Sequence, residues 1–81
     1  MIIGTVKGSI WATKKDERLN GCKLMLVKIN EKLIVATDEV GAGVGDKVLI
    51  CMGSSAHISK DAPIDAAIVG IIDSLESEDL I

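Results

Sequence analysis

The chain is short, aliphatic and mildly acidic. It has 81 residues, of which 48% are hydrophobic, yet it contains one Trp and neither Phe nor Tyr. A chain of this length forms one small domain, and its many Ile, Val and Leu residues exclude an intrinsically disordered protein. Two cysteines are too few for a disulfide-stabilised miniprotein, and charged residues interrupt every apolar run too early for a transmembrane helix. Because a domain this small buries only a little over ~60% of its unfolded surface, the aliphatic surplus predicts self-association.

The net charge of −3 at pH 7 provides no positive field that would attract a nucleic acid. Basic residues are scattered, apart from Lys14, Lys15 and Arg18 in one polar stretch. We expect no secretory signal, because the first residues lack a charged segment followed by an apolar run. Cys22 and Cys51 lie far apart, as expected of reduced thiols in a cytoplasmic protein, although spacing alone leaves a disulfide open.

The first element predicted along the chain is a long β-strand over residues 2–13. Apolar or small residues occupy its even positions and mostly polar residues its odd positions, which is the period of a strand with one buried face. Gly4 and Gly8 favour strong coiling or a close backbone neighbour, as at the corner of a barrel. A polar stretch follows and ends in an Asn-Gly turn signal at residues 20 and 21.

Four further strands complete an all-β prediction. Concentrations of β-branched and other aliphatic residues place them at residues 22–29, 32–38, 47–52 and 67–73. The short link of Asn30 and Glu31 predicts a hairpin, and Pro63 opens either a single helical turn around Asp65 and Ala66 or a loop. The predicted domain covers residues 1–75. Residues 76–81 form an acidic tail that is either mobile or docked on a neighbour.

The second and fourth strands are apolar on both faces. In the second strand, Leu24 and Leu26 share one face, while Met25 and Val27 share the other with Ile29. A small barrel has a single interior, so such strands need cover from outside. Either a helix or the long polar loop folds over the outer face, or that face is a subunit interface. We favour the interface, and its candidate residues are Met25, Val27 and Trp11, since Trp is enriched at interface cores.

A glycine-rich segment, Gly41-Ala42-Gly43-Val44-Gly45, precedes the fourth strand. It does not fit a phosphate-binding loop, because such a loop leads into a helix N-terminus. Here a strand follows, and Asp46 would repel a phosphate. The glycines therefore serve a tight turn or a close approach of backbones, including one between subunits, or they form a plain flexible loop.

No group of residues supports catalysis, a metal site or a cofactor. Cys22, Cys51 and His57 lack the spacing of metal ligands. A His that follows Ser54 and Ser55 in a turn is more typical of a solvated side chain than of a nucleophile–base pair. Asp38, Asp65 and Asp73 are isolated carboxylates, so acid–base pairing has no support either. We expect neither an enzyme nor a cofactor-binding protein.

A five-stranded β domain of this size also fits an oligonucleotide-binding barrel. Such a site needs exposed aromatic side chains for base stacking and a basic groove. The chain offers Trp11 as its single aromatic residue and carries a net negative charge. Both features argue against nucleic-acid binding. A single-stranded nucleic-acid-binding module is kept as the alternative function because the predicted barrel fits it.

Several segments form a pattern that is more specific than any one of them. In order they read IGTV and WATK, LNGCKL, DEVGAGVGDKVL, GSSA and PIDAAIVGIID, beginning at residues 3, 11, 19, 38, 53 and 63. Together they resemble the EutN/CcmL-type vertex proteins of bacterial microcompartments, and the resemblance covers roughly residues 1–75.

The resemblance implies a small β-barrel related to the oligonucleotide-binding fold, assembled as a cyclic pentamer. Family members cap the corners of polyhedral protein shells in the bacterial cytoplasm, and they are structural rather than catalytic. A flat hexagonal sheet cannot close on itself, so a five-fold unit at each corner supplies the curvature. The expected partners are other copies of the chain and hexameric shell proteins, with no nucleic acid and no membrane.

In such a ring, small residues are expected to line the narrow axial opening, because they let chains crowd at an axis. The candidates are Gly41, Gly43 and Gly45, or Ser54, Ser55 and Ala56. His57 is a further interface candidate, and it stands where we expect Arg in many relatives. A charge at this position would titrate near pH ~6.5.

Overall fold

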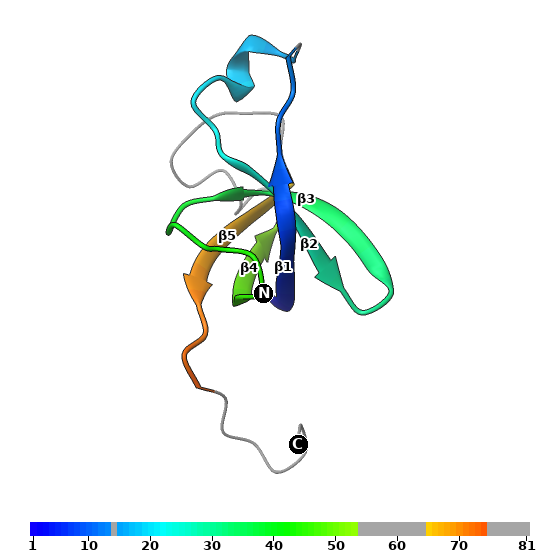
Figure 1. The fold of residues 1–81 in the computed structure, drawn as a ribbon, viewed down its shortest axis with the longest axis vertical. Helices are drawn as coiled ribbons and strands as arrows, with labels where there is room; N and C mark the ends of the chain where they lie inside the picture. The colour runs from blue at the N-terminus through cyan, green and yellow to red at the C-terminus, as the bar shows by residue number, and fades with distance from the viewer. Residues whose placement is uncertain (14, 54–64, 75–81) are drawn as a thin grey trace.

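Five strands close into a barrel in the computed structural model, which describes residues 1–13, 15–53 and 65–74 (Figure 1). The strands are β1 (Ile2–Ile10), β2 (Leu24–Ile29), β3 (Lys32–Asp38), β4 (Lys47–Met52) and β5 (Ala66–Ile71). Their order around the barrel is β1-β2-β3-β5-β4. Neighbouring strands are antiparallel except β3 and β5, which are parallel. The predicted five-stranded all-β barrel is confirmed.

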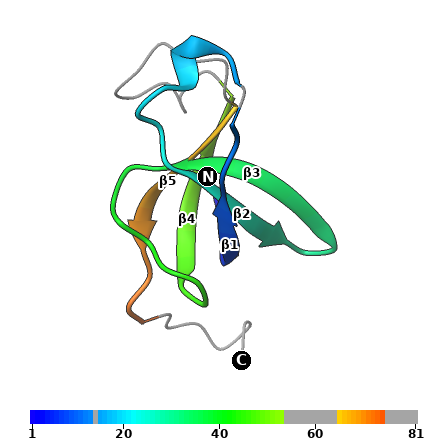
Figure 2. The ribbon, with the colours of Figure 1, turned by 45° about the horizontal axis from the view of Figure 1, so that its top comes forward.

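The segment between β1 and β2 leaves the barrel, which makes both strands shorter than predicted. It extends beyond the barrel end and contains a 3₁₀ turn, η1 (Glu17–Leu19) (Figure 2). Asp16 caps this turn, since its side chain accepts a hydrogen bond from the Arg18 amide at 2.9 Å. The short helical turn therefore lies here, in the polar stretch. Of the turn predicted after Pro63, Asp65 forms a bend and Ala66 begins β5, while Pro63 itself lies outside the described residues.

Aliphatic side chains from all five strands fill the barrel interior. Its largest fully buried side chains include Val6, Met25, Val27, Val48, Ile50 and Ile68. Alanines complete the core at positions 36, 42 and 66. Ala36 of β3 and Ala66 of β5 let their strands approach closely around a narrow interior, and Ala42 belongs to the loop after β3.

The prediction that placed Met25 and Val27 on the outer, interface-forming face of β2 is wrong. Both side chains are buried, at 1% and 0% exposed, and Val27 is paired with the equally buried Val6 of β1. The outward face carries Leu24 and Leu26 instead, which are half-buried. In a strand that is apolar on both sides, alternation separates two faces but does not tell which one points inward.

Gly4 allows β1 to pass close to the core. A Cβ atom at this position would lie 2.7 Å from Val27 Cγ1 and 2.9 Å from Ile50 Cδ1. Gly8 lies where the pairing of β1 with β2 shifts register, and a Cβ atom there would meet nothing within 4 Å. The predicted close neighbour is thus found at Gly4, and the irregularity of the strand at Gly8.

We predict that Gly4→Ala destabilises the protein by about 1–3 kcal/mol, because the added methyl overpacks the core. Gly8→Ala is the matched control and should change the free energy of unfolding by less than about 0.5 kcal/mol. Urea unfolding at identical chain concentrations measures both. Equal stabilities of the two variants would contradict the close approach at Gly4.

Candidate assembly surface

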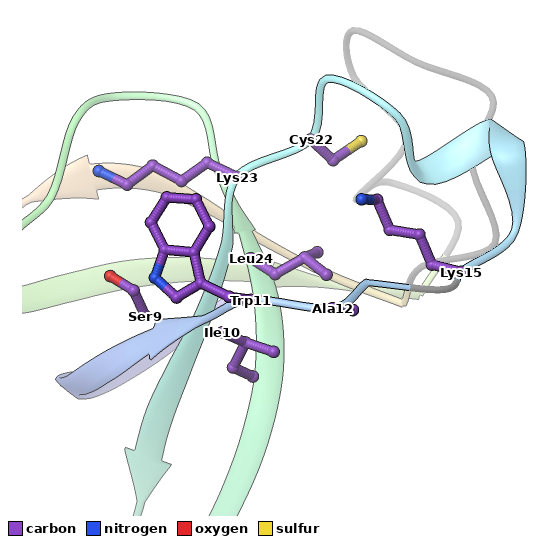
Figure 3. A pocket seen from close by; sticks show the side chains of 8 residues that line it. All are labelled: Ser9, Ile10, Trp11, Ala12, Lys15, Cys22, Lys23 and Leu24. Atoms are coloured by element: carbon purple, nitrogen blue, oxygen red, sulfur yellow. The ribbon is translucent and has the colours of Figure 1, made fainter.

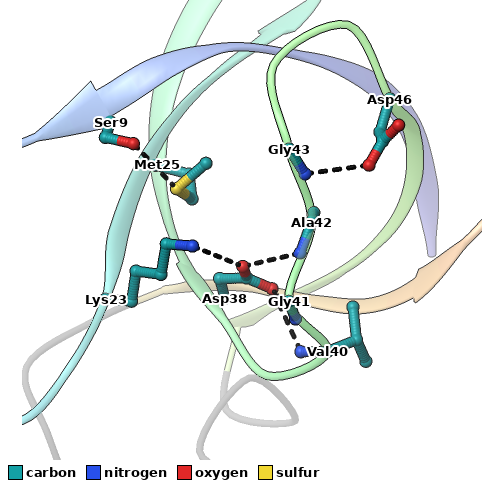
Figure 4. Close-up of polar contacts among 9 residues, drawn as sticks. All are labelled: Ser9, Lys23, Met25, Asp38, Val40, Gly41, Ala42, Gly43 and Asp46. Atoms are coloured by element: carbon teal, nitrogen blue, oxygen red, sulfur yellow. Dashed lines mark hydrogen bonds and ion pairs between the residues drawn. The ribbon is translucent and has the colours of Figure 1, made fainter.

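The loop between β3 and β4 is organised by one buried carboxylate. The Asp38 side chain is 0% exposed. Its Oδ1 accepts hydrogen bonds from the amides of Val40 at 3.0 Å and Gly41 at 2.9 Å, and its Oδ2 accepts one from Ala42 at 2.8 Å (Figure 4). Lys23 Nζ lies 3.7 Å from the same Oδ2. Three amide donors and a cation around one carboxylate hold the start of the loop in a single conformation.

The second half of the loop closes on itself and on β1. The Gly43 amide donates to Asp46 Oδ2 at 2.8 Å, and the Asp46 amide donates back to the Gly43 carbonyl at 3.1 Å. The Gly45 amide donates to the Val6 carbonyl, and the Val6 amide donates to the Asp46 carbonyl. The loop is therefore a tight, anchored turn and not a plain flexible one.

Two glycines of this loop are required by the backbone of a single chain. Gly41 and Gly45 have φ values of +81° and +94°, a region that other residues rarely adopt. Gly43 has no such constraint, and the nearest atom to a Cβ built there is Asp46 Oδ2 at 3.8 Å. All three glycines are exposed, and Val44 between them is 68% exposed, whereas Ala42 is buried.

Apolar side chains remain exposed on two separate parts of the barrel wall. On the outer face of β3, Leu33 and Val35 are 59% and 45% exposed, and Val35 is paired with Leu26 of β2. On another part of the wall, the exposed Ile3 of β1 is paired with Leu49 of β4, whose side chain lies over Gly70. Exposed apolar patches of this kind mark interaction sites.

An apolar hollow of about 450 Å³ opens beside the β2–β3 hairpin. Ile2, Ile29, Ile34 and Met52 supply its apolar lining, and the turn residues Asn30 and Glu31 lie at its edge together with Lys32. The hairpin itself was predicted from its two-residue link, and Asn30 adopts the positive φ of 53° that this turn needs.

Trp11 is the most exposed large apolar side chain among the described residues, at 92%. It follows β1 and forms one wall of a second, shallow pocket of about 130 Å³ (Figure 3). Trp11 was predicted to lie at a subunit interface, and its side chain is at the surface, where such a contact is possible. The remaining candidates, Ser54, Ser55, Ala56 and His57, lie outside the described residues.

The polar segment beside this pocket has its own ion pair. The guanidinium of Arg18 bonds both carboxylate oxygens of Asp16, at 3.1 and 2.9 Å. The side-chain hydrogen bonds, followed by the backbone bond from Arg18, lower the pKa of Asp16 to about 2. At neutral pH this carboxylate is therefore charged, and both of its oxygens are hydrogen-bonded to Arg18.

Among the residues that the structure describes, no group of three or more His, Cys, Asp or Glu side chains could hold a metal ion. Cys22 and Cys51 are both free and half-buried. In the same part of the chain, no helix is long and apolar enough to cross a membrane.

Sequence reasoning missed Asp38 and the outer face of β3. Asp38 looked like an isolated carboxylate, because its partners are backbone amides that carry no sequence signal. The run Leu33-Ile34-Val35-Ala36 is apolar on both faces, like the second and fourth predicted strands. The same pattern could therefore have identified the exposed face of β3 from the sequence.

We predict that Asp38→Asn costs about 1–3 kcal/mol, because an amide group can replace only one of the two accepting oxygens and leaves a buried donor unpaired. Lys23→Met, which removes only the half-exposed cation, should cost less than about 1 kcal/mol. Amide hydrogen exchange at Gly41 and Ala42 reports the loop directly. Exchange that rises equally in both variants would argue against the carboxylate as the organiser.

Comparison with known proteins gives a consistent result. Residues 1–73 match the family described as "Ethanolamine utilisation protein EutN/carboxysome". The chain is 46% identical to the bacterial microcompartment shell vertex protein GrpN of Rhodospirillum rubrum (strain F11), over 95% of this chain and 98% of that relative.

Solved structures agree with this match. A carboxysome subunit, CcmL, superposes with a TM-score of 0.91 at 37% identity, over 98% of this chain and 93% of the other. The GrpN pentameric microcompartment shell protein from Rhodospirillum rubrum superposes with a TM-score of 0.85 at 40% identity, over 95% and 100%.

Proposed function

The chain belongs to the EutN/CcmL family, and on that premise we propose that it is a shell protein whose pentamers form the vertices of a bacterial microcompartment in the cytoplasm. The observation that carries this proposal is the likeness to GrpN, a pentameric microcompartment shell protein, which extends over 95% of this chain. At 40% identity and a TM-score of 0.85, the likeness concerns the whole barrel rather than one motif.

The apolar surface supports a ring rather than a pair. A two-fold dimer uses the same patch on both subunits, whereas a ring joins two different patches in a head-to-tail contact. Here Leu33 and Val35 lie on one part of the wall, and Ile3 and Leu49 lie on another. We assign these two patches to the two sides of the subunit contact, with a closing rotation that yields five copies.

The axial opening is assigned to the small-residue surfaces. Because Gly43 needs neither a positive φ nor internal space, we assign its small size to a contact with a neighbouring copy. Gly41, Gly45 and residues 54–56 remain candidates for the same lining, and Trp11 and His57 for contacts between chains. Hexameric shell proteins are the proposed partners around the pentamer, in agreement with the vertex role of GrpN.

The proposed role is structural rather than catalytic. The relatives are named as shell vertex proteins, and the described residues bring no set of catalytic side chains together. The relatives named above give the nucleic-acid alternative no support, and the wall of β2 and β3 exposes Leu33 and Val35 rather than the aromatic side chains that base stacking needs.

Native mass spectrometry tests the assembly. We expect the chain of 8.5 kDa to be detected mainly as a pentamer at micromolar concentration, because its exposed apolar patches are satisfied only in a closed ring. A chain that stays monomeric throughout this range would contradict the proposal.

The assignment of the β3 face has its own test. Val35→Lys places a charge in the proposed contact, where it would lose its water. We expect it to raise the chain concentration needed for assembly by about ten-fold, equivalent to about 1.4 kcal/mol, with an unchanged far-ultraviolet circular dichroism spectrum. Glu17→Lys, in the 3₁₀ turn away from the barrel wall, is the control. Rings of equal stability in both variants would place the contact elsewhere.

A further inference from the structure

The pocket beside Trp11 is apolar at its floor and positive at its edge. Trp11, Ile10 and Leu24 supply apolar walls, while the Lys15 and Lys23 side chains reach along two sides (Figure 3). An indole left almost fully in water, next to other apolar side chains, is the arrangement of a recognition surface, since Trp contributes much of the binding free energy where it is covered.

The ammonium groups of the two lysines remain accessible to a ligand. Lys23 Nζ lies 3.7 Å from Asp38 Oδ2, but its side chain is still 56% exposed. No ion pair involves Lys15 within the described ranges 1–13, 15–53 and 65–74. Of the two acidic residues on the neighbouring turn, Asp16 is bound to Arg18, and Glu17 is exposed in the first position of η1. The pocket therefore suits a ligand with both aliphatic and acidic groups.

One segment of this chain has that composition. Residues 75–81 read LESEDLI and lie outside the described residues. Three of the seven are carboxylates and three are large aliphatic residues. The lysines of the pocket match the carboxylates, and the indole with Ile10 and Leu24 matches the aliphatic side chains.

The geometry favours the tail of another copy over the chain's own. β5 runs away from the barrel end at which β1 terminates (Figure 1). After β5, the Ile72 amide bonds to the carbonyl of Lys47, which is paired with Thr5 near the start of β1. From Thr5 to Trp11 the strand direction covers about 20 Å, and seven extended residues span at most about 25 Å. A tail that folded back on its own barrel would need most of its length to reach the pocket, and few residues would be left to bind there.

We propose that residues 75–81 of one copy dock in the Trp11 pocket of a neighbouring copy in the ring, a contact that rests on the proposed pentamer. The acidic side chains pair with Lys15 and Lys23, and the aliphatic side chains cover the indole. Each chain then holds its neighbour by a tail as well as by the barrel wall.

Trp11 fluorescence tests this contact in the full-length protein. The chain has one Trp and no Tyr, so the emission reports this pocket alone. Under conditions where native mass spectrometry finds rings, we expect blue-shifted emission that is protected from acrylamide. The variant Glu76→Lys/Glu78→Lys/Asp79→Lys should still form rings but show a red shift and lose this protection, because its reversed charges repel the pocket.

A charge exchange provides the matched control. Lys15→Glu alone should weaken the shielding of Trp11, by about two- to five-fold in the equilibrium between docked and free tail. Combined with Glu78→Lys, it should recover part of the shielding, a coupling that independent sites do not show. A merely structural loss of the tail would not be rescued in this way.

The outcomes separate the two proposals. Rings in which Trp11 is exposed, or in which the reversed tail leaves its shielding unchanged, overturn the tail contact and leave the pentamer standing. Shielding that persists in monomers after dilution overturns the assignment to a neighbouring copy. A chain that forms no rings at any concentration overturns both.

Discussion

The buried carboxylate of Asp38 connects the closure of the barrel to the loop that the barrel displays. Its backbone forms one of only two residue pairs between β3 and β5, at Ile68, and the Glu39 amide extends this seam by bonding the Ile68 carbonyl. Its side chain fixes the next turn of the chain through three amides. A single residue thus stabilises the shortest seam of the barrel and orients the glycine loop, and neither feature is independent of the other.

Around that seam, the barrel has room for only part of the chain's aliphatic content. The interior is filled by side chains from five strands and approached so closely at Gly4 that even one methyl group would clash. The aliphatic residues that remain, such as Leu33, Val35 and Ile3, are left on the wall. The surplus noted from composition is therefore a property of the surface of the single chain.

The strands were largely predictable, whereas the sides of the strands and the organising residue were not. The limits of β3 and β4 match the prediction, because their aliphatic runs are bounded by turn residues and glycines. Met25 and Val27 were placed on the wrong side, since the inward face depends on pairing with Val6 across the barrel. Asp38 escaped notice because its role depends on amides brought to it by the fold. The family resemblance predicted the pentameric barrel as a whole, but it did not indicate which way the side chains of β2 point or what Asp38 does.

The poverty in aromatic residues follows from the same crowding. The interior is too narrow for an indole side chain. Alanines occupy positions 36, 66 and 67 there, and Gly4 passes close to Val27. An aromatic side chain in this chain therefore has to lie outside, where leaving it in water gains nothing for the fold of a single copy. Trp11 lies outside, beside lysines, on a protein of net negative charge. Its position fits the proposed docking of a neighbouring tail, because burying the indole becomes favourable only when another chain covers it.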